Sequence, residues 1–548
     1  MKIRGADIVV EILKEKNVGT VFGYPGGTVA ALYDALYKNR GEIRHIRTAH
    51  EQGAAHAADG YARMTGKAAV CISTSGPGAT NLVTGIATAF MDSTPVVFIT
   101  GNVPLLQIGT DSFQEVDITG ITIPITKYNV MVKDGNELAG ELRKAFTIAE
   151  EGRKGPVLVD IPKDILEGQW EFEKEQLPKR SSGKNACEAW SIDETVIQNT
   201  VRLIENAKRP LILAGGGVRI SDASKELLRF AELTGGLVSC TMMALGEFPS
   251  SHKQYIGNAG MYAGDALKKA VEESDVVIAV GTRFSNKTEF TEKLLKGKTI
   301  IHIDRDRAEI NKNVPATEYI VGDAGNVLNA LNRRLEKDTH KVSAETLKWQ
   351  EEAHNGSERH FTDKNGSNSK MTMEEAVKTV AKTGGFDTVV TDVGLHQTMT
   401  AAFYGFEKHG SFITSGGLGT MGFGMGAAIG AYEATGGRIL LITGDGSFGM
   451  EMQELATLKR YGIPLTIMIM NNGALGMVKS IQRSRFGRRY SETVIRKDEV
   501  SYSKLAKAFG LTAAKATSVK QLEEILEKAK NNTNDDCKGA FIIDCRVK

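Results

Sequence analysis

Short apolar runs recur along this chain, separated by longer stretches with helical periodicity. The runs are rich in β-branched residues and apolar on both faces, which is typical of parallel strands covered by helices on both sides. The expected strands are 68–74, 94–100, 156–161, 209–215, 275–281, 299–304, 387–394, 438–446 and 464–472. The pattern predicts an α/β protein built from doubly wound parallel sheets.

Two polar passages, 167–189 and 335–369, interrupt this periodicity and are interpreted as linkers. They divide the chain into blocks 1–166, 190–334 and 370–548, each of which alternates strands with helices. Since a domain usually holds about 100–200 residues, we expect three α/β domains.

Composition narrows the classes of function. The 548 residues carry a formal charge of +2, and no basic stripe is interleaved with aromatic residues, so neither nucleic acid nor an anionic membrane is an expected partner. Five scattered cysteines fit a reducing compartment. The first residues show neither a signal peptide nor a transit segment, and no apolar run approaches the roughly 20 residues that span a bilayer. We expect a cytoplasmic protein that acts on small molecules.

One segment carries specific chemistry: a strand ends at Gly444-Asp445-Gly446, and the next strand ends at Asn471-Asn472 after a helix expected over 450–462. Because a right-handed crossover puts both strand ends on one edge, Asp445 and Asn472 should converge. A carboxylate and an amide oxygen suit Mg²⁺, and the glycines and the helix N-terminus suit a diphosphate. The alternative is an ordinary Asp-Gly turn before a buried strand.

The spacing of these residues resembles the thiamin diphosphate signature, and other motifs extend the resemblance over nearly the whole chain. In order they are FGYPGG (22–27), HEQGAAHAADGYAR (50–63), TSGPGATN (74–81), GTDSFQEVD (109–117), GRKGPVLVDIPKD (152–164), LAGGGV (213–218), GTRF (281–284), TSGGLGTMGFGMGAAIGA (414–431) and NNGALGMV (471–478). Together they are similar to the catalytic subunits of the acetolactate (acetohydroxyacid) synthase family. The resemblance implies pyrimidine-binding, central FAD-binding and diphosphate-binding domains. It also implies decarboxylation of pyruvate and transfer of the hydroxyethyl unit to a second 2-oxoacid, pyruvate or 2-oxobutyrate, as in branched-chain amino acid biosynthesis.

The resemblance assigns roles around the thiamin. Glu51 would be the acid that relays a proton through the pyrimidine ring, Met421 would hold the cofactor bent, and the Gly419 carbonyl would hold its amino group. Residues expected around the reacting carbonyl are Gly27, Phe113 and Gln114; those expected at the diphosphate are Gly444, Asp445, Gly446, Ser447 and Met477; those expected at Mg²⁺ are Asp445, Asn472 and Ala474. Without the resemblance, Glu51 would be an exposed first-turn residue and Met421 core filler.

The middle block is where the family binds FAD. The positions that match are Gly215, Gly216, Gly217, Arg283, Asp304 and Asp323, with Arg153 from the first block. In the acetolactate synthases the flavin is thought to be structural, whereas the similar pyruvate oxidases use it for electron transfer. A triple glycine after a strand, taken alone, is a weak nucleotide motif and often only a turn.

Three positions depart from the family pattern. Ile481 stands where the family has a tryptophan that lines the acceptor pocket beside Val478, and Lys287 replaces an arginine that grips the acceptor carboxylate. Tyr262 alters a stretch that contacts the flavin, while Lys163 still matches a cation of the substrate channel. These changes keep open another thiamin diphosphate enzyme, such as a carboligase, lyase or pyruvate oxidase with a different acceptor. A non-catalytic flavin-binding or nucleotide-binding homologue is the third alternative.

The family also implies an assembly. Since Glu51 lies in the first block and the diphosphate residues in the third, the family builds each site from two subunits, which predicts a homodimer or homotetramer. The alternative is a monomer in which both blocks meet within one chain. A small regulatory subunit is a further expected partner.

Overall fold

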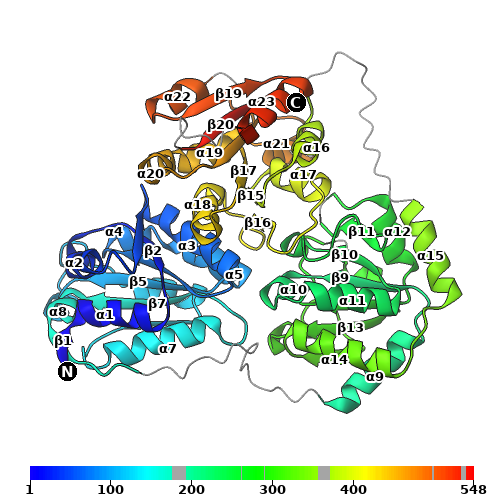
Figure 1. Ribbon diagram of the computed structural model, residues 1–548, viewed down its shortest axis with the longest axis horizontal. Helices are drawn as coiled ribbons and strands as arrows, with labels where there is room; N and C mark the ends of the chain where they lie inside the picture. The colour runs from blue at the N-terminus through cyan, green and yellow to red at the C-terminus, as the bar shows by residue number, and fades with distance from the viewer. Residues whose placement is uncertain (176–192, 261, 289, 356–370, 497–498, 532–538) are drawn as a thin grey trace. The chain divides into compact units, whose positions relative to one another are not determined.

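The computed structural model describes residues 1–175, 193–260, 262–288, 290–355, 371–496, 499–531 and 539–548. All the strands predicted above are present, and neighbouring strands pair in parallel, for example Ala69–Ser73 with Val96–Asn102, Pro210–Ala214 with Val276–Val280, and Ile439–Gly444 with Thr466–Asn471. Three six-stranded sheets carry helices on their faces (Figure 1), which confirms the α/β class. No helix in the described ranges is both long and apolar enough to cross a membrane.

Residues 1–184, 385–396 and 413–547 form one compact unit with two of these sheets. The first sheet has the order β3 (Arg44–Arg47), β2 (Thr20–Gly23), β4 (Ala69–Ser73), β5 (Val96–Asn102), β7 (Val157–Pro162) and β6 (Tyr128–Met131). Its helices are α1 (Gly5–Glu15), α2 (Ala30–Lys38), α3 (Glu51–Thr65), α4 (Pro77–Thr80), α5 (Val83–Asp92), α6 (Ile118–Thr122), α7 (Leu138–Glu150) and α8 (Lys163–Glu167). A small antiparallel pair joins β1 (Lys2–Arg4) to β8 (Gln169–Glu171).

The second sheet of this unit has the order β16 (Phe412–Thr414), β15 (Thr388–Thr391), β17 (Ile439–Gly444), β18 (Thr466–Asn471), β20 (Phe541–Arg546) and β19 (Thr512–Ala516). Its helices are α18 (Phe423–Thr435), α19 (Asp445–Glu451), α20 (Leu455–Tyr461), α21 (Gly476–Arg485), α22 (Tyr502–Ala508) and α23 (Val519–Asn531). The single crossover helix expected over 450–462 is wrong: α19 and α20 are joined by a 3₁₀ turn at Met452–Glu454.

The other unit comprises residues 185–384 and 397–412. Its sheet has the order β11 (Tyr255–Asn258), β10 (Leu237–Cys240), β9 (Pro210–Ala214), β12 (Val276–Val280), β13 (Thr299–Asp304) and β14 (Glu318–Val321). The helices are α9 (Glu194–Glu205), α10 (Gly216–Ile220), α11 (Ser224–Thr234), α12 (Asp265–Glu273), α13 (Glu292–Leu295), α14 (Ala324–Lys337), α15 (Ala344–Asn355), α16 (Met373–Thr383) and most of α17 (Leu395–Phe403).

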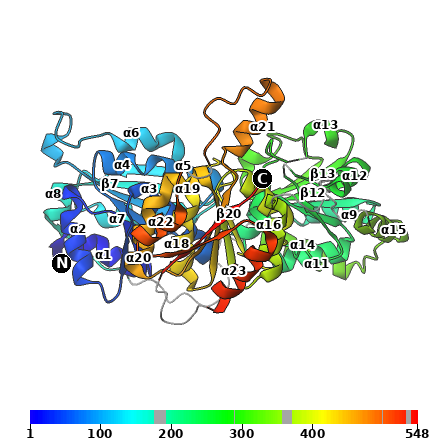
Figure 2. The same ribbon diagram turned by 90° about the horizontal axis from the view of Figure 1, so that it is seen from above.

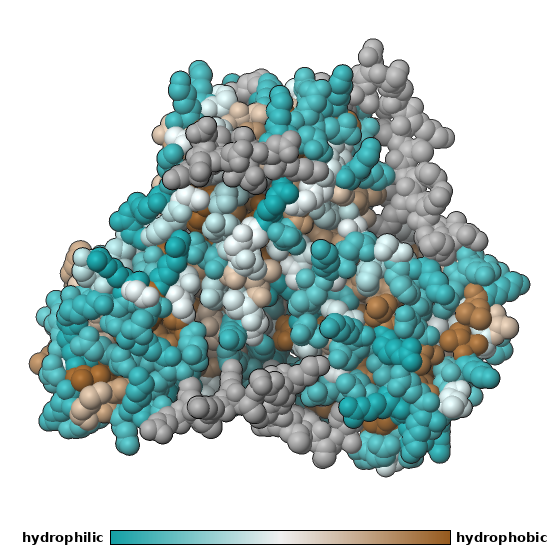
Figure 3. Space-filling view, viewed as in Figure 1, coloured by the Kyte–Doolittle hydropathy of each residue, from teal (hydrophilic) through white to brown (hydrophobic). Residues whose placement is uncertain are grey.

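The passages expected to be linkers contain structure in their described parts. Residues 167–189 include β8, and 335–369 include α15 and the end of α14. The domain boundaries given above therefore stay a prediction. On the face drawn in Figure 3 hydrophilic residues predominate and the hydrophobic patches are small, because most apolar side chains lie between the sheets and their helices.

Strand order identifies the edge of each sheet where a ligand would bind. In doubly wound sheets, ligands lie beyond the carboxyl ends of strands at the point where the strand order reverses. The order reverses between β2 and β4 in the first sheet, between β9 and β12 in the central sheet and between β15 and β17 in the third. Most of the glycine-rich motifs follow these strands directly, so the sheets bring the predicted site residues to these edges.

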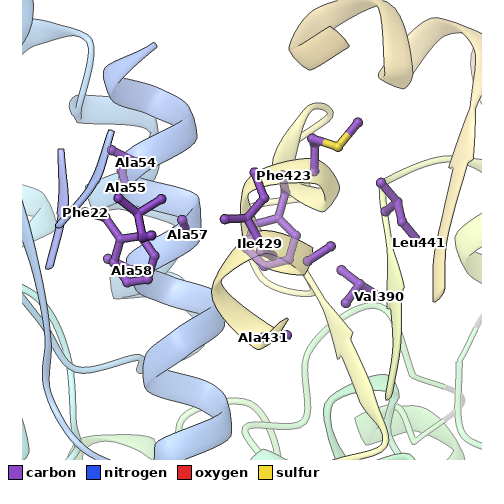
Figure 4. Close-up of a cluster of buried hydrophobic side chains, with 14 of the residues drawn as sticks. Phe22, Ala54, Ala55, Ala57, Ala58, Val390, Phe423, Ile429, Ala431 and Leu441 are labelled. Carbon is purple, nitrogen blue, oxygen red and sulfur yellow. The ribbon is translucent and has the colours of Figure 1, made fainter. Parts of the chain in front are cut away.

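Helices α3 and α18 join the two sheets of the first unit. Ala54, Ala55, Ala57 and Ala58 of α3 face Phe423 and Ile429 of α18 in one buried cluster (Figure 4). Glycines let the helix backbones approach closely. A Cβ on Gly430 would overlap the carbonyl oxygen of Ala57, and a Cβ on Gly60 would overlap that of Ala427.

This packing makes Gly430→Ala a strong test of the helix contact. The added methyl group must push α3 away, and overpacking of a core typically costs about 1–3 kcal/mol of unfolding free energy. Gly140→Ala is the matched control, since Gly140 lies within α7 with no atom within 4 Å of its Cβ position. There alanine should leave stability unchanged or raise it by up to about 1 kcal/mol. Denaturant unfolding measures both; equal stabilities would contradict the packing described.

Candidate active site

The third sheet brings Asp445 to the loop that follows β18. Gly473 N–H donates to Asp445 Oδ2 at 2.8 Å, and Gly446 N–H donates to Oδ1 at 3.1 Å. Asn472, the neighbour of Gly473, accepts from Ala474 N–H at 3.0 Å through Oδ1. The expected convergence of Asp445 with the Asn472 loop is therefore present in the structure.

The two asparagines of this loop have different environments. Asn471 is buried, and its Nδ2 donates to Asp544 Oδ1 at 3.1 Å, which ties β18 to β20. Asn472 is only half-buried and lies at the open end of the strand. Asp445, Asn472 and the Ala474 backbone are thus a set of oxygen donors of the type that Mg²⁺ accepts. No group of three or more His, Cys, Asp or Glu side chains in the described residues forms another metal cluster.

Met421 lies beside the Asp445 loop. A Cβ on Gly446 would lie 2.5 Å from Leu475 Cδ2 and 3.6 Å from Met421 Cε, so this glycine leaves the space that both side chains need. Met421 is half-buried and follows Gly419, whose φ of +75° suits glycine. Because Met421 is only half-buried and lies beside Gly446, a ligand bound at the Asp445 loop could contact its side chain.

Four further side chains hold the glycine-rich loop and were missed by the sequence analysis. Arg63 of α3 donates to the Thr414 carbonyl at 2.7 Å and pairs with Asp92 at 3.0 Å. Asp92 accepts from the backbone of Gly416 and Gly417, at 3.1 and 2.7 Å. Thr88 and Thr420 share a hydroxyl hydrogen bond of 2.7 Å. The first block thus fixes the loop that carries Gly419 and Met421.

Another missed group follows β15, opposite the Asp445 loop at the reversal of strand order. Asp392 accepts from Gly422 N–H at 2.8 Å, and its burial raises its pKa to about 6. Ser447 Oγ donates to the Val393 carbonyl at 2.9 Å. His396 lies 2.9 Å from the Cβ position of Gly444, and burial lowers its pKa to about 4, so the ring is neutral near pH 7. The strand predicted over 387–394 ends earlier, at Thr391, so Asp392 and Val393 lie on the loop and not in the strand.

Glu51 is the first residue of α3. Its Oε2 accepts from Asn81 Nδ2 at 3.0 Å, and its Oε1 lies 3.4 Å from the Cβ position of Gly78. Asn81 and Gly78 belong to the TSGPGATN motif, so the structure brings this motif to the half-buried carboxylate. Asn81 is thus a polar neighbour of Glu51 that the motif contains but that its pattern alone did not single out.

The residues expected around the reacting carbonyl lie on loops of the first sheet. Gly27 begins a 3₁₀ turn after β2, and the neighbouring Thr28 bonds Thr74 at 3.0 Å, which joins the loops after β2 and β4. Gln114 has a φ of +63° and lies against Gly76. Phe113 is 88% exposed.

The residues expected in the substrate channel are accessible. Helix α21 stands out from the third sheet (Figure 2) and buries none of its residues. Val478 and Ile481 on α21 are about half exposed, and Met477 is partly buried. Lys163 begins α8 and lies 3.9 Å from Glu167, a weak surface pair.

The central sheet places most of the residues expected at FAD on the loops after its strands. Gly215, Gly216 and Gly217 follow β9, and a Cβ on Gly217 would lie 2.6 Å from Gly281 Cα. Asp323 caps α14 and accepts from Ser221 Oγ at 2.8 Å. The others are Arg283 after β12 and Asp304 at the end of β13. Half-buried Tyr262, in the stretch expected to contact the flavin, follows β11, and exposed Lys287, expected at the acceptor carboxylate, follows β12. Arg153, in the other unit, donates to Ser93 Oγ at 2.8 Å.

Family models match most of the chain. The model described as the N-terminal TPP binding domain of thiamine pyrophosphate enzymes matches residues 3–121, that of the central domain matches 197–331, and that of the C-terminal TPP binding domain matches 392–545. The first two matches contain both strands of their reversal point, and the third match begins directly after β15.

Individual relatives are similar over nearly their whole length. A probable acetolactate synthase large subunit of Methanocaldococcus jannaschii is 43% identical over 96% of this chain and 90% of its own. An acetolactate synthase of Mycobacterium bovis is 41% identical over 96% of this chain and 86% of its own. The acetolactate synthase large subunit of Haemophilus influenzae is 38% identical over 96% and 92%.

Proposed function

The chain belongs to the acetolactate synthase family of thiamine pyrophosphate enzymes, and from this premise we propose that it condenses two 2-oxoacids with loss of CO₂. Pyruvate is the proposed donor, and a second pyruvate or 2-oxobutyrate is the acceptor. The hydrogen bond between Asp445 and Gly473 carries this proposal, because it brings the acid of the GDG motif to the asparagine loop as a diphosphate-bound cation requires.

Each block has a proposed part in binding the cofactors. Residues 1–166 would bind the pyrimidine of thiamin diphosphate, 370–548 its diphosphate and Mg²⁺, and 190–334 FAD. Asp445, Asn472 and the Ala474 carbonyl would hold Mg²⁺, while Gly444, Gly446 and Ser447, at the start of α19, would lie against the diphosphate. When bound, thiamin diphosphate supplies the carbon nucleophile and the electron sink for decarboxylation.

The protein's own groups do the remaining work. Glu51 gives and takes a proton at its carboxyl oxygens, and Asn81 orients this carboxyl group by its 3.0 Å hydrogen bond. Met421, which lies beside Gly446, would hold the cofactor bent, and the Gly419 carbonyl would hold its amino group. Gly27 and Gln114 would offer donors to the oxygen of the reacting carbonyl, where negative charge develops. If a second copy of the chain covers Phe113, Val478 and Ile481, these exposed side chains would exclude water from the site.

Product stoichiometry tests this proposal. The purified chain is supplied with thiamin diphosphate, Mg²⁺ and FAD, and then with pyruvate alone. Acetolactate should appear, with half as many molecules of CO₂ released as pyruvate consumed. Equal numbers of CO₂ and pyruvate, with acetaldehyde or acetate as product, would instead identify a decarboxylase or oxidase.

A second candidate rests on the acceptor residues. Ile481 is 48% exposed on α21, and Lys287 is an exposed point charge where bidentate carboxylate binding is expected of arginine. Because a single apolar change in a pocket alters discrimination by about 1–3 kcal/mol, these two positions favour a shifted acceptor. Another thiamin diphosphate carboligase, lyase or oxidase is therefore the alternative. Adding 2-oxobutyrate to the pyruvate assay reports the acceptor choice.

A homodimer is the minimum assembly that we propose. Large apolar side chains are exposed on both sheet layers of the first unit: Leu106, Phe113 and Ile123 on connections of the first sheet, and Leu418, Met450 and Ile481 on connections of the third. Such side chains mark surfaces that a second copy would cover. Relatives named large subunits also support a small regulatory subunit as a partner.

Mixing two inactive variants tests whether subunits share a site. If Glu51 of one chain serves the diphosphate site of another, a mixed dimer of Glu51→Gln and Asp445→Asn chains contains one intact site. Co-refolded or co-expressed variants should then recover activity that neither has alone. Absence of recovery, with mixed dimers present by mass spectrometry, would favour sites within one chain.

FAD binding is proposed for the central unit, since the loops of Gly215–Gly217 and Gly281–Arg283 meet where the strand order reverses. The flavin should be structural. We expect the purified protein to retain or bind stoichiometric flavin, seen by its visible absorbance, and that absorbance should not bleach during anaerobic turnover of pyruvate. Bleaching would contradict a structural role and support an oxidase.

A further inference from the structure

Glu454 closes the 3₁₀ turn between α19 and α20 and is completely buried. Its Oε1 accepts from Ala49 N–H at 3.1 Å and His50 N–H at 3.0 Å, while its Oε2 lies 3.0 Å from the same Ala49 nitrogen. Thr457 Oγ1 donates to Oε2 at 2.5 Å. One carboxylate of the third block thus binds the backbone of the two residues that precede Glu51.

These contacts fix the beginning of α3. His50 is its N-cap and accepts from Gln52 N–H at 3.1 Å, and Thr48 Oγ1 donates to the His50 carbonyl at 2.8 Å. Glu454 binds the Ala49 and His50 N–H groups that lie just outside the helix. Gly53 leaves the space for it, because a Cβ there would overlap Glu454 Oε1.

The same turn links this anchor to the predicted metal loop. Asp445 begins α19, and Glu454 ends the 3₁₀ turn that follows, so a continuous helical segment joins the two acids. The break between α19 and α20, which the sequence pattern did not predict, is where Glu454 bonds to the first block. The start of α3 is therefore held by the segment that follows the GDG motif of the same chain.

We propose that Glu454 is a positioning residue that fixes the Glu51 carboxylate for proton transfer, an inference that rests on the proposed function. Glu454 acts through the Ala49 and His50 N–H groups. Two backbone N–H groups and one hydroxyl group donate to this fully buried carboxyl group, and misplacement of a catalytic group by about 1 Å can cost about 100-fold in rate. A purely structural anchor between the two blocks is the competing interpretation.

Glu433 offers a matched control for that interpretation. It lies on α18 with a buried side chain and binds Arg44 of β3 through Oε2 at 2.9 Å and Oε1 at 3.1 Å. It therefore also joins the third block to the first through a carboxylate, but it binds the Arg44 side chain at the start of β3 and not the backbone of the residues next to Glu51. Glu433→Ala should lower the unfolding temperature while leaving proton transfer intact.

The test compares Glu454→Ala, Glu454→Gln and Glu433→Ala in the full chain by three readouts. The first is amide hydrogen exchange of residues 47–52 in the cofactor-free protein, which should accelerate in Glu454→Ala and not in Glu433→Ala.

The second readout is the rate at which bound thiamin diphosphate exchanges its C2 proton for deuterium, measured by quenched-flow NMR. We expect about a 100-fold decrease in Glu454→Ala and a smaller one in Glu454→Gln, which keeps one acceptor oxygen. The third is the split between kcat, which should fall with the exchange rate, and the KM for pyruvate, which should stay nearly constant.

Three results would overturn the inference. A wild-type rate of C2 proton exchange in Glu454→Ala would show that Glu51 needs no such anchor. If that variant fails to fold, the same rate in Glu454→Gln would show it. Equal losses in Glu433→Ala and Glu454→Ala would show a general effect of weakened packing between the blocks. Absence of C2 exchange in the wild-type chain itself would refute the proposed function, and the inference with it, so the two failures are distinguishable.

Discussion

Replacing Glu51 with glutamine is expected to lower kcat for acetolactate formation by about 100-fold to 10,000-fold, the range for removal of a general acid–base group. Glutamine has nearly the same shape and can still accept the hydrogen bond from Asn81, so the start of α3 should keep its structure. An amide cannot exchange a proton with the cofactor ring. Steady-state kinetics, with cofactor affinity measured by calorimetry, should show a large loss of kcat and little change in binding.

The control for this substitution is Glu194→Gln. Glu194 is also the first residue of a helix, α9, and its carboxylate favours that helix through the same electrostatic effect. If Glu51 served only its helix, both variants would lose a few tenths of a kcal/mol in stability and keep their activity. Near-wild-type kcat in Glu51→Gln would therefore contradict the assigned role.

Asp445→Asn should weaken the binding of Mg²⁺ and thiamin diphosphate by about 100-fold or more. Changes to groups that only support a metal ligand already cost about 10-fold to 100-fold in affinity, and here the charge of a ligand itself is removed. The amide can still accept from Gly473 N–H, so the loop should persist. Calorimetric titration with Mg²⁺ at saturating thiamin diphosphate, and the reverse titration, measure the loss.

Asp544→Asn is the comparison for that measurement. Asp544 lies on neighbouring β20 and binds Asn471 at 3.1 Å and Arg546 at 2.9 Å, so it supports the same strand end but is not among the predicted cation ligands. It should lower thermal stability more than metal affinity. Equal affinities in Asp445→Asn and the wild type would place the cation elsewhere.

The sequence pattern predicts the elements of this protein well where the signal is local. Runs of residues that are apolar on both faces predicted β17 and β18. The right-handed crossover between them predicted that Asp445 approaches the Asn472 loop. Glu51, at the first turn of α3, and Met421, beside Gly446, lie where a ligand of such a site could reach them.

Contacts between blocks were not predictable by the same means. Arg63 reaches Thr414, Asp92 reaches Gly416, and Glu454 reaches Ala49, in each case across more than 300 residues of sequence. Neither hydrophobic periodicity nor a turn motif predicts such pairs, because each of these charged residues, taken alone, is typical of an exposed helix surface. The break between α19 and α20 at Met452–Glu454 was not predictable for the same reason. Glu454, in this turn, accepts a hydrogen bond from His50 of the first block.

The central claim is that this chain joins two 2-oxoacids, and carbon tracing tests it most directly. The wild-type protein with thiamin diphosphate, Mg²⁺ and FAD is given pyruvate labelled with carbon-13 at its second carbon, and the products are followed by NMR. The account predicts acetolactate in which two adjacent carbons are labelled and therefore coupled. Labelled acetaldehyde or acetate without that coupling, or unconsumed pyruvate, would contradict it.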